Sequence, residues 1–438
     1  MKAIAPQLEP IVSPGVICNW ENLEVIRQKQ IIQAIAPETP PSCIVYPNTQ
    51  AELASVIACA NHNNWRVLPC GSGSKLSWGG LASGVDLVVS TERLNQLIQH
   101  AVGDLTVTVE AGTKFAELQA TLAKAGQFLA LDPAAPESAT MGGIVATADT
   151  GSLRQRYGGI RDQLLGISFV RADGEIAKAG GRVVKNVAGY DLMKLFSGSY
   201  GTLGIITCVT FRVYPLPEAS GTVVLTGTAD AIAQATTTLR SSALTPVAAD
   251  LLSTQLVLSL GVGKGLGLVT RFGSLTESVK QQSAALLELG QQLGLQGASY
   301  SAGDEAELWQ TLREQMLASA TEPVITCKIG VVPVSAVATV AKLDSVAPQQ
   351  AMGQIHVGSG LGLLRLENGA VTPQVVLEMR SLCQSQGGFL TVLEAPISSK
   401  QQLDVWGYSG NALDLMRQIK QQFDRRNILS PHRFVGGI

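Results

Sequence analysis

A glycine-rich turn at residues 69–75, Pro69-Cys70-Gly71-Ser72-Gly73-Ser74-Lys75, offers the clearest chemistry in the sequence. It directly follows Trp65–Leu68, a short apolar run typical of a buried strand. Glycines at alternate positions let the backbone take positive φ and point successive N–H groups at one spot, where they can bind phosphate oxygens. The serine hydroxyls and Lys75 can add hydrogen bonds and charge. The turn is therefore a candidate phosphate or pyrophosphate site, with an ordinary loop between strands as the alternative.

Two common phosphate-binding motifs do not describe this turn. Lys75 lacks the Gly-Lys-Ser/Thr context of a P-loop, and no G-x-G-x-x-G opens a helix here. The nucleotide site, if present, is of another type.

A second stretch, residues 131–159, is rich in Pro, Ala, Gly, Thr and Ser and poor in large side chains. Small residues in such number let the backbone lie close against a large flat ligand. A flexible linker is the alternative, but linkers rarely carry residues such as Met141, Ile144 and Tyr157. We expect this stretch to form the wall of a ligand site.

The segments around the turn predict alternating strands and helices. Thr49–Glu52 is a capping box, followed by apolar residues at helical spacing. Leu105–Glu110 alternates as a half-exposed strand does, and Asp173-Gly174 is a hairpin turn. The proline-rich Pro215–Pro217 marks a domain boundary.

The second half of the chain predicts a looser mixture of strands and helices. Leu256–Leu260 and Ile355–Leu366 are predicted strands, whereas Ser278–Leu293 and Leu413–Phe423 are predicted helices. Such a mixture suits an α+β domain that covers a binding site.

Composition excludes several classes of protein. The 438 residues are 46% hydrophobic and 15% charged, which favours a compact α/β protein over a disordered one. A net charge of -2 without a basic run argues against nucleic acid as a partner. Seven scattered cysteines with no C-x-x-C pair predict reduced thiols in a cytoplasm and no internal iron–sulfur or zinc site. The sequence has no continuous apolar signal core, so we expect membrane contact only through partners.

Taken together, these motifs resemble the FAD-linked oxidase family, which has the vanillyl-alcohol-oxidase or PCMH-type FAD-binding fold. Within the family, the chain is most similar to the smaller flavin subunits of bacterial glycolate oxidases. The resemblance covers residues 41–217 and the tail, and depends on three features that occur in order. They are Gly71–Lys75 with Trp78-Gly79-Gly80, the run Gly181–Leu192, and the ending Val405-Trp406-Gly407 with Asn427–Ile438.

The resemblance implies an α+β chain with four parts. They are an N-terminal arm (1–40), a two-subdomain PCMH-type FAD-binding domain (41–217), an α+β cap for substrate or partner (218–400), and a C-terminal helix and tail (401–438) that returns to the flavin domain.

The resemblance also implies which residues hold FAD. The turn at 70–75 would wrap the pyrophosphate, residues from 133 to 151 would follow the ribityl chain and the ring, and the stretch 201–206 would approach the adenosine half. Arg161 and Asp162, with Gly159, would brace the loop. The full implied set is Pro69, Cys70, Gly71, Ser72, Gly73, Ser74, Lys75, Pro133, Thr140, Gly142, Gly143, Asp149, Thr150, Gly151, Arg161, Asp162, Gly201, Gly204 and Ile206.

Where the chain departs from the family pattern, the expected chemistry changes. Covalent members often carry a histidine next to the phosphate loop, but here Ser74, Lys75 and Leu76 occupy that place, so we expect FAD to be non-covalent. The stretch Gln354–Gly360 keeps one histidine of a metal motif, and one histidine cannot build a metal site.

Few side chains are candidates for catalysis. His356 is the candidate base, with a structurally hydrogen-bonded histidine as the alternative. Arg433 could hold a substrate carboxylate, or it could be a surface or capping arginine. Trp406 and Tyr408 could line the pocket or belong to the core.

Three hypotheses for function follow. The chain is a flavin subunit that oxidises a 2-hydroxy acid, such as glycolate to glyoxylate, and passes electrons to a larger flavin subunit and an iron–sulfur subunit. Alternatively, it is a non-catalytic flavoprotein or scaffold subunit of such a complex, or a stand-alone FAD-dependent oxidoreductase with another substrate.

Overall fold

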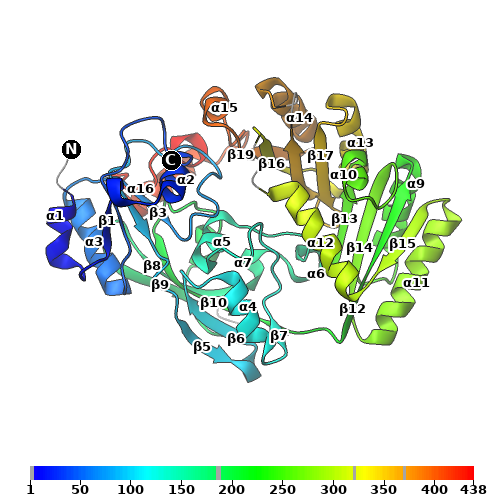
Figure 1. The fold of residues 1–438 in the computed structure, drawn as a ribbon, viewed down its shortest axis with the longest axis horizontal. Coiled ribbons are helices and arrows are strands. Elements are labelled where there is room, and N and C mark those ends of the chain that lie inside the picture. Colours follow the sequence, from blue (N-terminus) through cyan, green and yellow to red (C-terminus); the bar gives the residue numbers. More distant parts are fainter. Residues whose placement is uncertain (1–3, 184–188, 319–321, 368–370) are drawn as a thin grey trace. The chain divides into compact units, whose positions relative to one another are not determined.

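The structure is a computed structural model, and it describes residues 4–183, 189–318, 322–367 and 371–438. The chain folds into two compact units (Figure 1). The first unit comprises Met1–Thr150, Gly159–Leu216 and Tyr408–Ile438, and the second comprises Gly151–Gly158 and Pro217–Gly407. The short segment 151–158 therefore belongs to the second unit, although both of its sequence neighbours belong to the first.

In the part of the chain that the structure describes, the strands form sheets of four, five, two and eight strands. The first, which we name the parallel sheet, has the order β1-β2-β4-β3, with β2, β4 and β3 parallel and β1 antiparallel to β2. The helix α3 connects β2 to β3. The bounds are β1 Ile17–Asn19, β2 Cys43–Val45, α3 Gln50–His62, β3 Val67–Cys70 and β4 Leu87–Ser90.

The start of α3 confirms the predicted cap. Thr49 Oγ1 accepts a hydrogen bond from the Glu52 N–H at 3.1 Å, as an N-cap residue does. The Glu52 carboxylate also accepts from the N–H groups of Asn48 and Ser13. The cap thus also ties the N-terminal segment to the helix.

The N-terminal segment is packed into the first unit. Ile4, Leu8 and Val16 are buried in one cluster with the β2, β3 and β4 strands. The helix α2 (Val25–Ile32) buries Ile31 against a neighbouring cluster. The other short elements of this segment are α1 Ala5–Leu8 and the 3-10 turns Glu9–Ile11 and Trp20–Asn22.

The second sheet of the first unit is antiparallel throughout, in the order β5-β6-β10-β8-β9. Alternate residues such as Val107, Val109 and Phe211 enter one core together with the helices on that face. The predicted hairpin turn lies between β8 and β9, where Gly174 has φ +88°. The strands are β5 Leu97–Ala101, β6 Thr106–Glu110, β8 Leu164–Val170, β9 Ile176–Gly180 and β10 Ile205–Arg212, with β7 Gln127–Phe128 and β11 Tyr214–Pro215 paired separately.

Several short helices complete the first unit. Among them, α5 carries the small residues of the stretch 131–159, and α16 is the predicted last helix, with the expected bounds. The helices are α4 Phe115–Ala123, α5 Met141–Thr147, α7 Ile160–Gln163, α8 Leu192–Phe196 and α16 Leu413–Phe423, with Val102–Asp104 and Val435–Gly437 as 3-10 turns.

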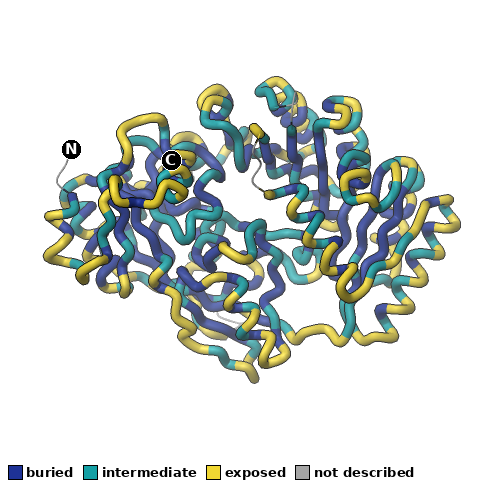
Figure 2. The backbone as a smooth tube through the Cα atoms, in the orientation of Figure 1, coloured by how far each residue is buried: buried dark blue, intermediate teal, exposed yellow. Residues whose placement is uncertain are grey.

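The second unit is built on an antiparallel sheet, the cap sheet, in the order β15-β12-β14-β13-β17-β18-β16-β19. Helices cover both faces, because adjacent residues of one strand enter different cores: Leu251 belongs to one apolar core and Leu252 to another, and helices contribute residues to both. Figure 2 shows long buried stretches along these strands. The strands are β12 Ala219–Gly227, β13 Ala248–Leu252, β14 Leu266–Ser274, β15 Gln296–Tyr300, β16 Ile325–Gly330, β17 Ala351–His356, β18 Leu361–Leu366 and β19 Phe389–Glu394.

The helices of the second unit come from its whole length. They are α6 Arg154–Tyr157, α9 Ala229–Ser241, α10 Thr254–Ser259, α11 Thr276–Gln292, α12 Ala302–Leu317, α13 Ala336–Val346, α14 Pro373–Ser385 and α15 Ile397–Gln402, with a 3-10 turn at Pro333–Ser335.

Two predictions for this unit were wrong. The apolar run Leu256–Leu260 is not a strand but most of α10, capped by Ser253, whose Oγ accepts from the Leu256 N–H at 3.4 Å. A short apolar run fits a buried helix as well as a buried strand, and Ser253 is the signal that decides between them. Ile355–Leu366 is the end of β17 and the whole of β18 rather than one strand. The run at residues 184–188 lies outside the described residues.

Within the described ranges, none of the helices combines the length and the apolar character that are needed to cross a bilayer.

Candidate functional site

The glycine-rich turn leaves a run of backbone donors exposed to one side. β3 ends at Cys70, and Gly73 takes φ +82°, which only glycine adopts without strain. Among the described residues, the N–H groups of 72–75 have no hydrogen-bond acceptor, whereas the Leu76 and Trp78 N–H groups close turns onto Gly73 and Lys75 at 3.1 Å. Successive unpaired N–H groups in a turn form an anion-binding nest.

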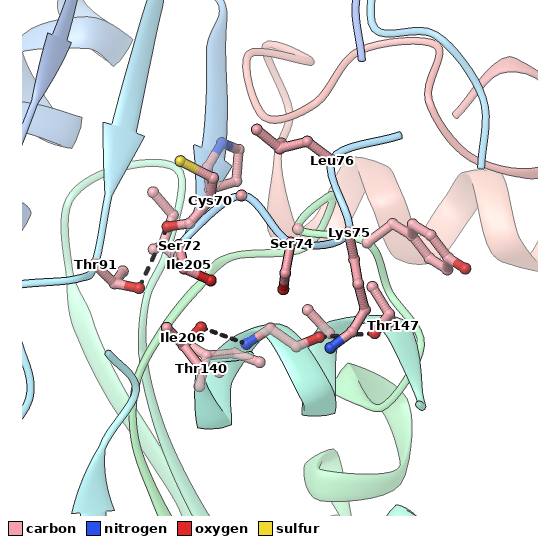
Figure 3. A pocket seen from close by; sticks show the side chains of 18 of the residues that line it. Cys70, Ser72, Ser74, Lys75, Leu76, Thr91, Thr140, Thr147, Ile205 and Ile206 are labelled. Atoms are coloured by element: carbon pink, nitrogen blue, oxygen red, sulfur yellow. Dashed lines mark hydrogen bonds between the residues drawn. The ribbon is translucent and has the colours of Figure 1, made fainter. Parts of the chain in front are cut away.

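These donors lie at the edge of a pocket. Figure 3 shows the turn above α5, with the Lys75 side chain extending from the turn toward that helix. A third segment, residues 200–206, and the tail residue Arg433 complete the wall. The lining residues are Pro69, Cys70, Gly71, Ser72, Gly73, Ser74, Lys75, Leu76, Thr91, Thr140, Gly142, Gly143, Ala146, Thr147, Tyr200, Gly201, Gly204, Ile205, Ile206 and Arg433.

Two glycines of the pocket are required because neighbouring side chains pack closely against their backbone. A Cβ on Gly71 would lie 2.1 Å from Thr140 Oγ1, and a Cβ on Gly142 would lie 2.8 Å from the Ala111 Cβ. Gly143 differs, because its Cβ would meet only Thr140 Oγ1, at 3.1 Å, and would otherwise enter open space. Thr140 therefore packs against the turn while it also caps α5, accepting from the Gly143 N–H at 3.4 Å.

Two buried cations belong to the same pocket. The Lys75 Nζ lies 3.0 Å from Asp149 Oδ2, with side chains that are only 5% and 7% exposed. Arg433 is 4% exposed, and its Nη2 donates to the Leu76 and Trp78 carbonyls at 2.8 and 3.2 Å. Burial lowers the pKa of Arg433 to about 10, which leaves the guanidinium charged near neutrality. The charge of Lys75 is balanced by Asp149, whereas Arg433 contributes positive potential to the wall.

A second group of residues fixes the shape of the turn from behind. Arg27 on α2 donates from Nη1 to the Ser72 carbonyl at 2.5 Å and forms an ion pair with Glu92 through Nη2. The Ser72 hydroxyl donates to the Ser138 carbonyl at 2.5 Å, so the turn is also tied to the stretch before α5. A Cβ on Gly73 would lie 2.5 Å from Arg27 Nη1, so the brace also requires glycine at that position.

The C-terminal tail returns to the first unit, as the sequence predicts, and places Arg433. Leu429 forms a parallel bridge with Val67, so the tail lies along the edge of the parallel sheet. The buried Lys420 on α16 donates to the Asp424 carboxylate at 2.7 Å and to the Thr202 and Leu429 carbonyls at 2.9 Å. These bonds link the tail to the 200–206 segment of the pocket.

The structure brings together most of the predicted FAD residues and leaves others apart. Residues 69–75 and the predicted residues of 140–143 and 201–206 line one pocket, and Arg433 joins them. The described lining residues do not include Pro133, Asp149, Thr150, Gly151, Arg161 or Asp162. Of these, Asp149 contacts Lys75, Gly151 belongs to the second unit, and Asp162 accepts from the Gly159 N–H at 2.8 Å and caps α7.

His356 lies elsewhere, in the second unit. Its Nδ1 is 2.5 Å from Asp250 Oδ1, and both residues are buried. Tyr408, a candidate pocket residue, instead accepts from the Ala412 N–H through its hydroxyl at 3.0 Å, and Trp406 packs against the core of the cap sheet. Among the described residues, no three His, Cys, Asp or Glu side chains are arranged to hold a metal ion.

Sequence reasoning missed Arg27, Glu92, Tyr200 and Asp250. A charged or polar residue within an apolar segment could have marked some of them as candidate site residues. Asp250 within Ala248–Leu252 is the clearest case. Arg27 carried no such signal, because its contact with Ser72 joins residues 45 positions apart.

The residues present fit a dinucleotide cofactor. The N–H nest of residues 72–75 and the buried guanidinium of Arg433, which line the same pocket, suit a pyrophosphate. The glycines keep the wall flat where a ring or a ribityl chain would lie.

Comparison with known proteins identifies that cofactor. Residues 41–180 match the model of the FAD binding domain family. A glycolate oxidase subunit GlcD of Bacillus subtilis is 25% identical over 90% of this chain and 89% of its own length. A glycolate oxidase subunit GlcE of Escherichia coli is 39% identical over 34% of this chain and 43% of its own length.

Other curated relatives match over shorter stretches, 34–52% of this chain. Those that are 30–39% identical, among them D-lactate and D-2-hydroxyglutarate dehydrogenases, match over only 31–48% of their own lengths. The chain thus spans less than half of those proteins.

Solved structures support the fold over both units. p-Cresol methylhydroxylase with its substrate bound has a TM-score of 0.73 at 16% identity, covering 98% of this chain and 96% of that one. Residues 41–180 are therefore an FAD-binding domain, and the chain is a flavoprotein with the fold of the PCMH-type FAD-linked oxidoreductases.

Proposed function

We propose that this chain is a flavin subunit that oxidises a small 2-hydroxy acid, with glycolate as the first substrate to test. The observation that carries the proposal is the similarity to the Bacillus subtilis glycolate oxidase subunit, because it extends over 90% of the chain and so includes the second unit. Other relatives are named as D-lactate and D-2-hydroxyglutarate dehydrogenases, and both of these acids are 2-hydroxy acids as well.

Bound FAD would supply the hydride acceptor, and the chain supplies binding and proton transfer. The nest at 72–75 and Arg433 hold the cofactor's phosphates. His356 is the candidate base for the substrate hydroxyl. Because Arg433 lines the same pocket as the nest, we assign its charge to the cofactor rather than to a substrate carboxylate.

The test is anaerobic reduction of the bound flavin in the purified chain and in the native complex. We expect glycolate, D-lactate or D-2-hydroxyglutarate to bleach the oxidised-flavin absorbance, and the fastest of them to define the substrate. A flavin that stays oxidised in both preparations with all three acids would refute the proposal.

We also propose that the chain works beside a larger flavin subunit and an iron–sulfur subunit. Two of its relatives are named as subunits of a glycolate oxidase. We expect dye reduction by glycolate to be low for the isolated chain and to rise in the reconstituted complex. Equal specific activity in both would show an independent enzyme.

A non-catalytic role within the complex is the second candidate. A scaffold needs the flavin pocket only for folding, so His356→Gln in this chain would then leave the activity of the complex unchanged. A loss of activity with retained assembly would exclude the scaffold role.

Finally, we propose that the FAD is held without a covalent bond. The residues after the nest are Ser74, Lys75 and Leu76, and the histidine nearest in sequence, His62, is the last residue of α3. Acid precipitation should release all the flavin into the supernatant; colour in the pellet would contradict this.

A further inference from the structure

A buried polar cluster lies on one face of the cap sheet. Asp250 on β13 and His356 on β17 are direct cross-strand partners, and Gln354 pairs with Leu252 two positions along. Ala249, Leu251 and Ile355 point to the opposite face, into the large apolar core. Asp250 is fully buried, so its carboxylate depends on protein donors.

Each oxygen of this carboxylate has its own partners. Oδ1 lies 2.5 Å from His356 Nδ1. Oδ2 accepts from Gln354 Nε2 at 2.9 Å and from the Ser152 hydroxyl. Ser152 comes from the segment 151–158, and Gln155 of that segment accepts from the N–H of Gly358, two residues after His356, at 3.0 Å.

This arrangement decides which ring nitrogen carries the proton. Burial alone would raise the pKa of Asp250, but the adjacent His356 and the hydrogen bonds from Ser152 and Gln354 lower it. An ionised carboxylate only accepts hydrogen bonds, so the proton of the neutral imidazole must be on Nδ1. The lone pair is then on Nε2.

We propose that Asp250, fixed by Ser152 and Gln354, is a positioning residue that holds His356 in the tautomer able to take a proton at Nε2. This inference rests on the proposed function. The hydroxyl O–H of the 2-hydroxy acid breaks, and its proton goes to Nε2. Bound FAD would supply the acceptor for the hydride from C2, so that the acid becomes a 2-oxo acid. Asp250 then stabilises the imidazolium that forms, as a buried carboxylate does in other His–Asp pairs.

Asparagine at position 250 would reverse the tautomer. Ser152 and Gln354 both donate to Oδ2, so the amide oxygen of Asp250→Asn would take that place and its NH₂ would face His356 Nδ1. The ring would then have to accept at Nδ1 and carry its proton on Nε2, where no lone pair remains for the substrate.

Other charged groups near the pair must be known before a pH profile is interpreted. They lie on the elements packed against β13 and β17. These groups are Arg154, Arg156 and Tyr157 on α6, Arg271 on β14, Lys342 and Asp344 on α13, Arg365 on β18, and Asp304, Glu305, Glu307, Arg313 and Glu314 on α12.

The experiment compares three variants of the flavin-loaded chain in its active assembly. We expect His356→Gln to lower kcat about a hundredfold or more. Asp250→Asn should lower kcat strongly, leave KM and flavin content nearly unchanged, and alter the pH profile of kcat/KM. Ser152→Ala should lower kcat only severalfold, because Gln354 still holds Oδ2.

A second measurement does not depend on activity. Spectra of ¹⁵N-histidine-labelled chain, assigned by the loss of one signal in His356→Gln, report the tautomer directly. We expect Nδ1–H in the wild type and Nε2–H in Asp250→Asn. An Nε2–H ring in the wild type would overturn the proposal even if Asp250→Asn did not fold.

The outcomes separate this inference from the proposed function. If His356→Gln retains full activity, the histidine is not the base, and the proposed function loses its proton acceptor. If His356→Gln is inactive while Asp250→Asn keeps the wild-type kcat and pH profile, His356 remains the base and the positioning role of Asp250 is wrong.

Discussion

The two polar sites of this chain are built in opposite ways. The candidate FAD pocket of the first unit is made mainly of backbone: four consecutive N–H groups, glycines in close contact, and carbonyls that hold Arg433. The cluster of the second unit is made of side chains, with Asp250 at its centre. A site made of backbone requires small residues that leave the N–H and C=O groups accessible. A site made of side chains requires particular functional groups at particular positions.

This difference predicts different sensitivities. In the pocket, we expect a side chain added at a glycine to weaken FAD binding, whereas many of the larger lining residues should tolerate substitution. In the cluster, even an isosteric change such as carboxylate to amide exchanges a hydrogen-bond acceptor for a donor. The predictions below test this contrast, from the largest expected effect to the smallest.

The largest effects should come from the pocket glycines. Gly73→Val and Gly143→Val should reduce bound FAD to less than about a tenth of the wild-type amount. At Gly73 the branched side chain meets Arg27 and Gln30 at positive φ, and at Gly143 it fills the space left for the ligand. Flavin per mole of purified chain measures the effect. Gly103→Val is the control, because nothing lies within 4 Å of its Cβ. Stoichiometric FAD in both pocket variants would show that the ligand lies elsewhere.

Arg433 comes next, as the side-chain contribution to a site built from backbone. Arg433→Ala removes a buried charge that donates to Leu76 and Trp78, and we expect FAD affinity to fall by about 2 kcal/mol, or roughly thirtyfold. Fluorescence titration of the apoprotein with FAD gives the Kd, with the exposed Arg212→Ala as control. An unchanged Kd together with a raised KM for the hydroxy acid would instead assign Arg433 to the substrate carboxylate.

A smaller effect should follow from the brace behind the turn. Arg27→Ala leaves the nest chemically intact but frees the Ser72 carbonyl and Glu92, so we expect about a fivefold weaker binding of ADP and FAD alike. Arg93→Ala is the matched control, because Arg93 donates to Gly15 and Asn48 and not to the turn. Affinity for ADP that equals the wild type would show that Arg27 does not shape the nest.

The same contrast explains how much of the molecule the sequence predicts. Alternate glycines after a buried run indicate a nest by themselves, because the constraint is local. Most of the predicted residues from 69 to 75, 140 to 143 and 201 to 206 therefore fall in one pocket. The brace from Arg27 could not be predicted in this way, since it depends on how α2 packs against the turn.

The second unit shows where sequence reasoning stops. His356 is visible as a rare residue, but its partner depends on the register of β13 against β17, which joins residues 106 positions apart. The register follows from the whole sheet rather than from either strand. The helix α10 was mistaken for a strand because an apolar run carries no period of its own, although Ser253 marks its start.

The smallest predicted effect is a dependence of stability on acid. Hydrogen bonds and His356 lower the pKa of the buried Asp250 below its usual range near 4. A carboxyl with a lowered pKa in the folded state adds stability that is complete above the pKa of the unfolded chain and is lost as pH falls through the folded value. We therefore expect Asp250→Asn to lower Tm by roughly 2–4 °C at pH 7 and by less at pH 3.

Calorimetry of both proteins across this pH range measures the difference, with Glu307→Gln as the control. Glu307 is an exposed carboxylate in the middle of α12, so its replacement should change Tm little at any pH. A gap between wild type and Asp250→Asn that stays constant from pH 7 to pH 3 would mean that the carboxyl does not titrate with unfolding. Packing, and not the charge of Asp250, would then determine the stability of the cluster. The contrast between the two units would no longer hold.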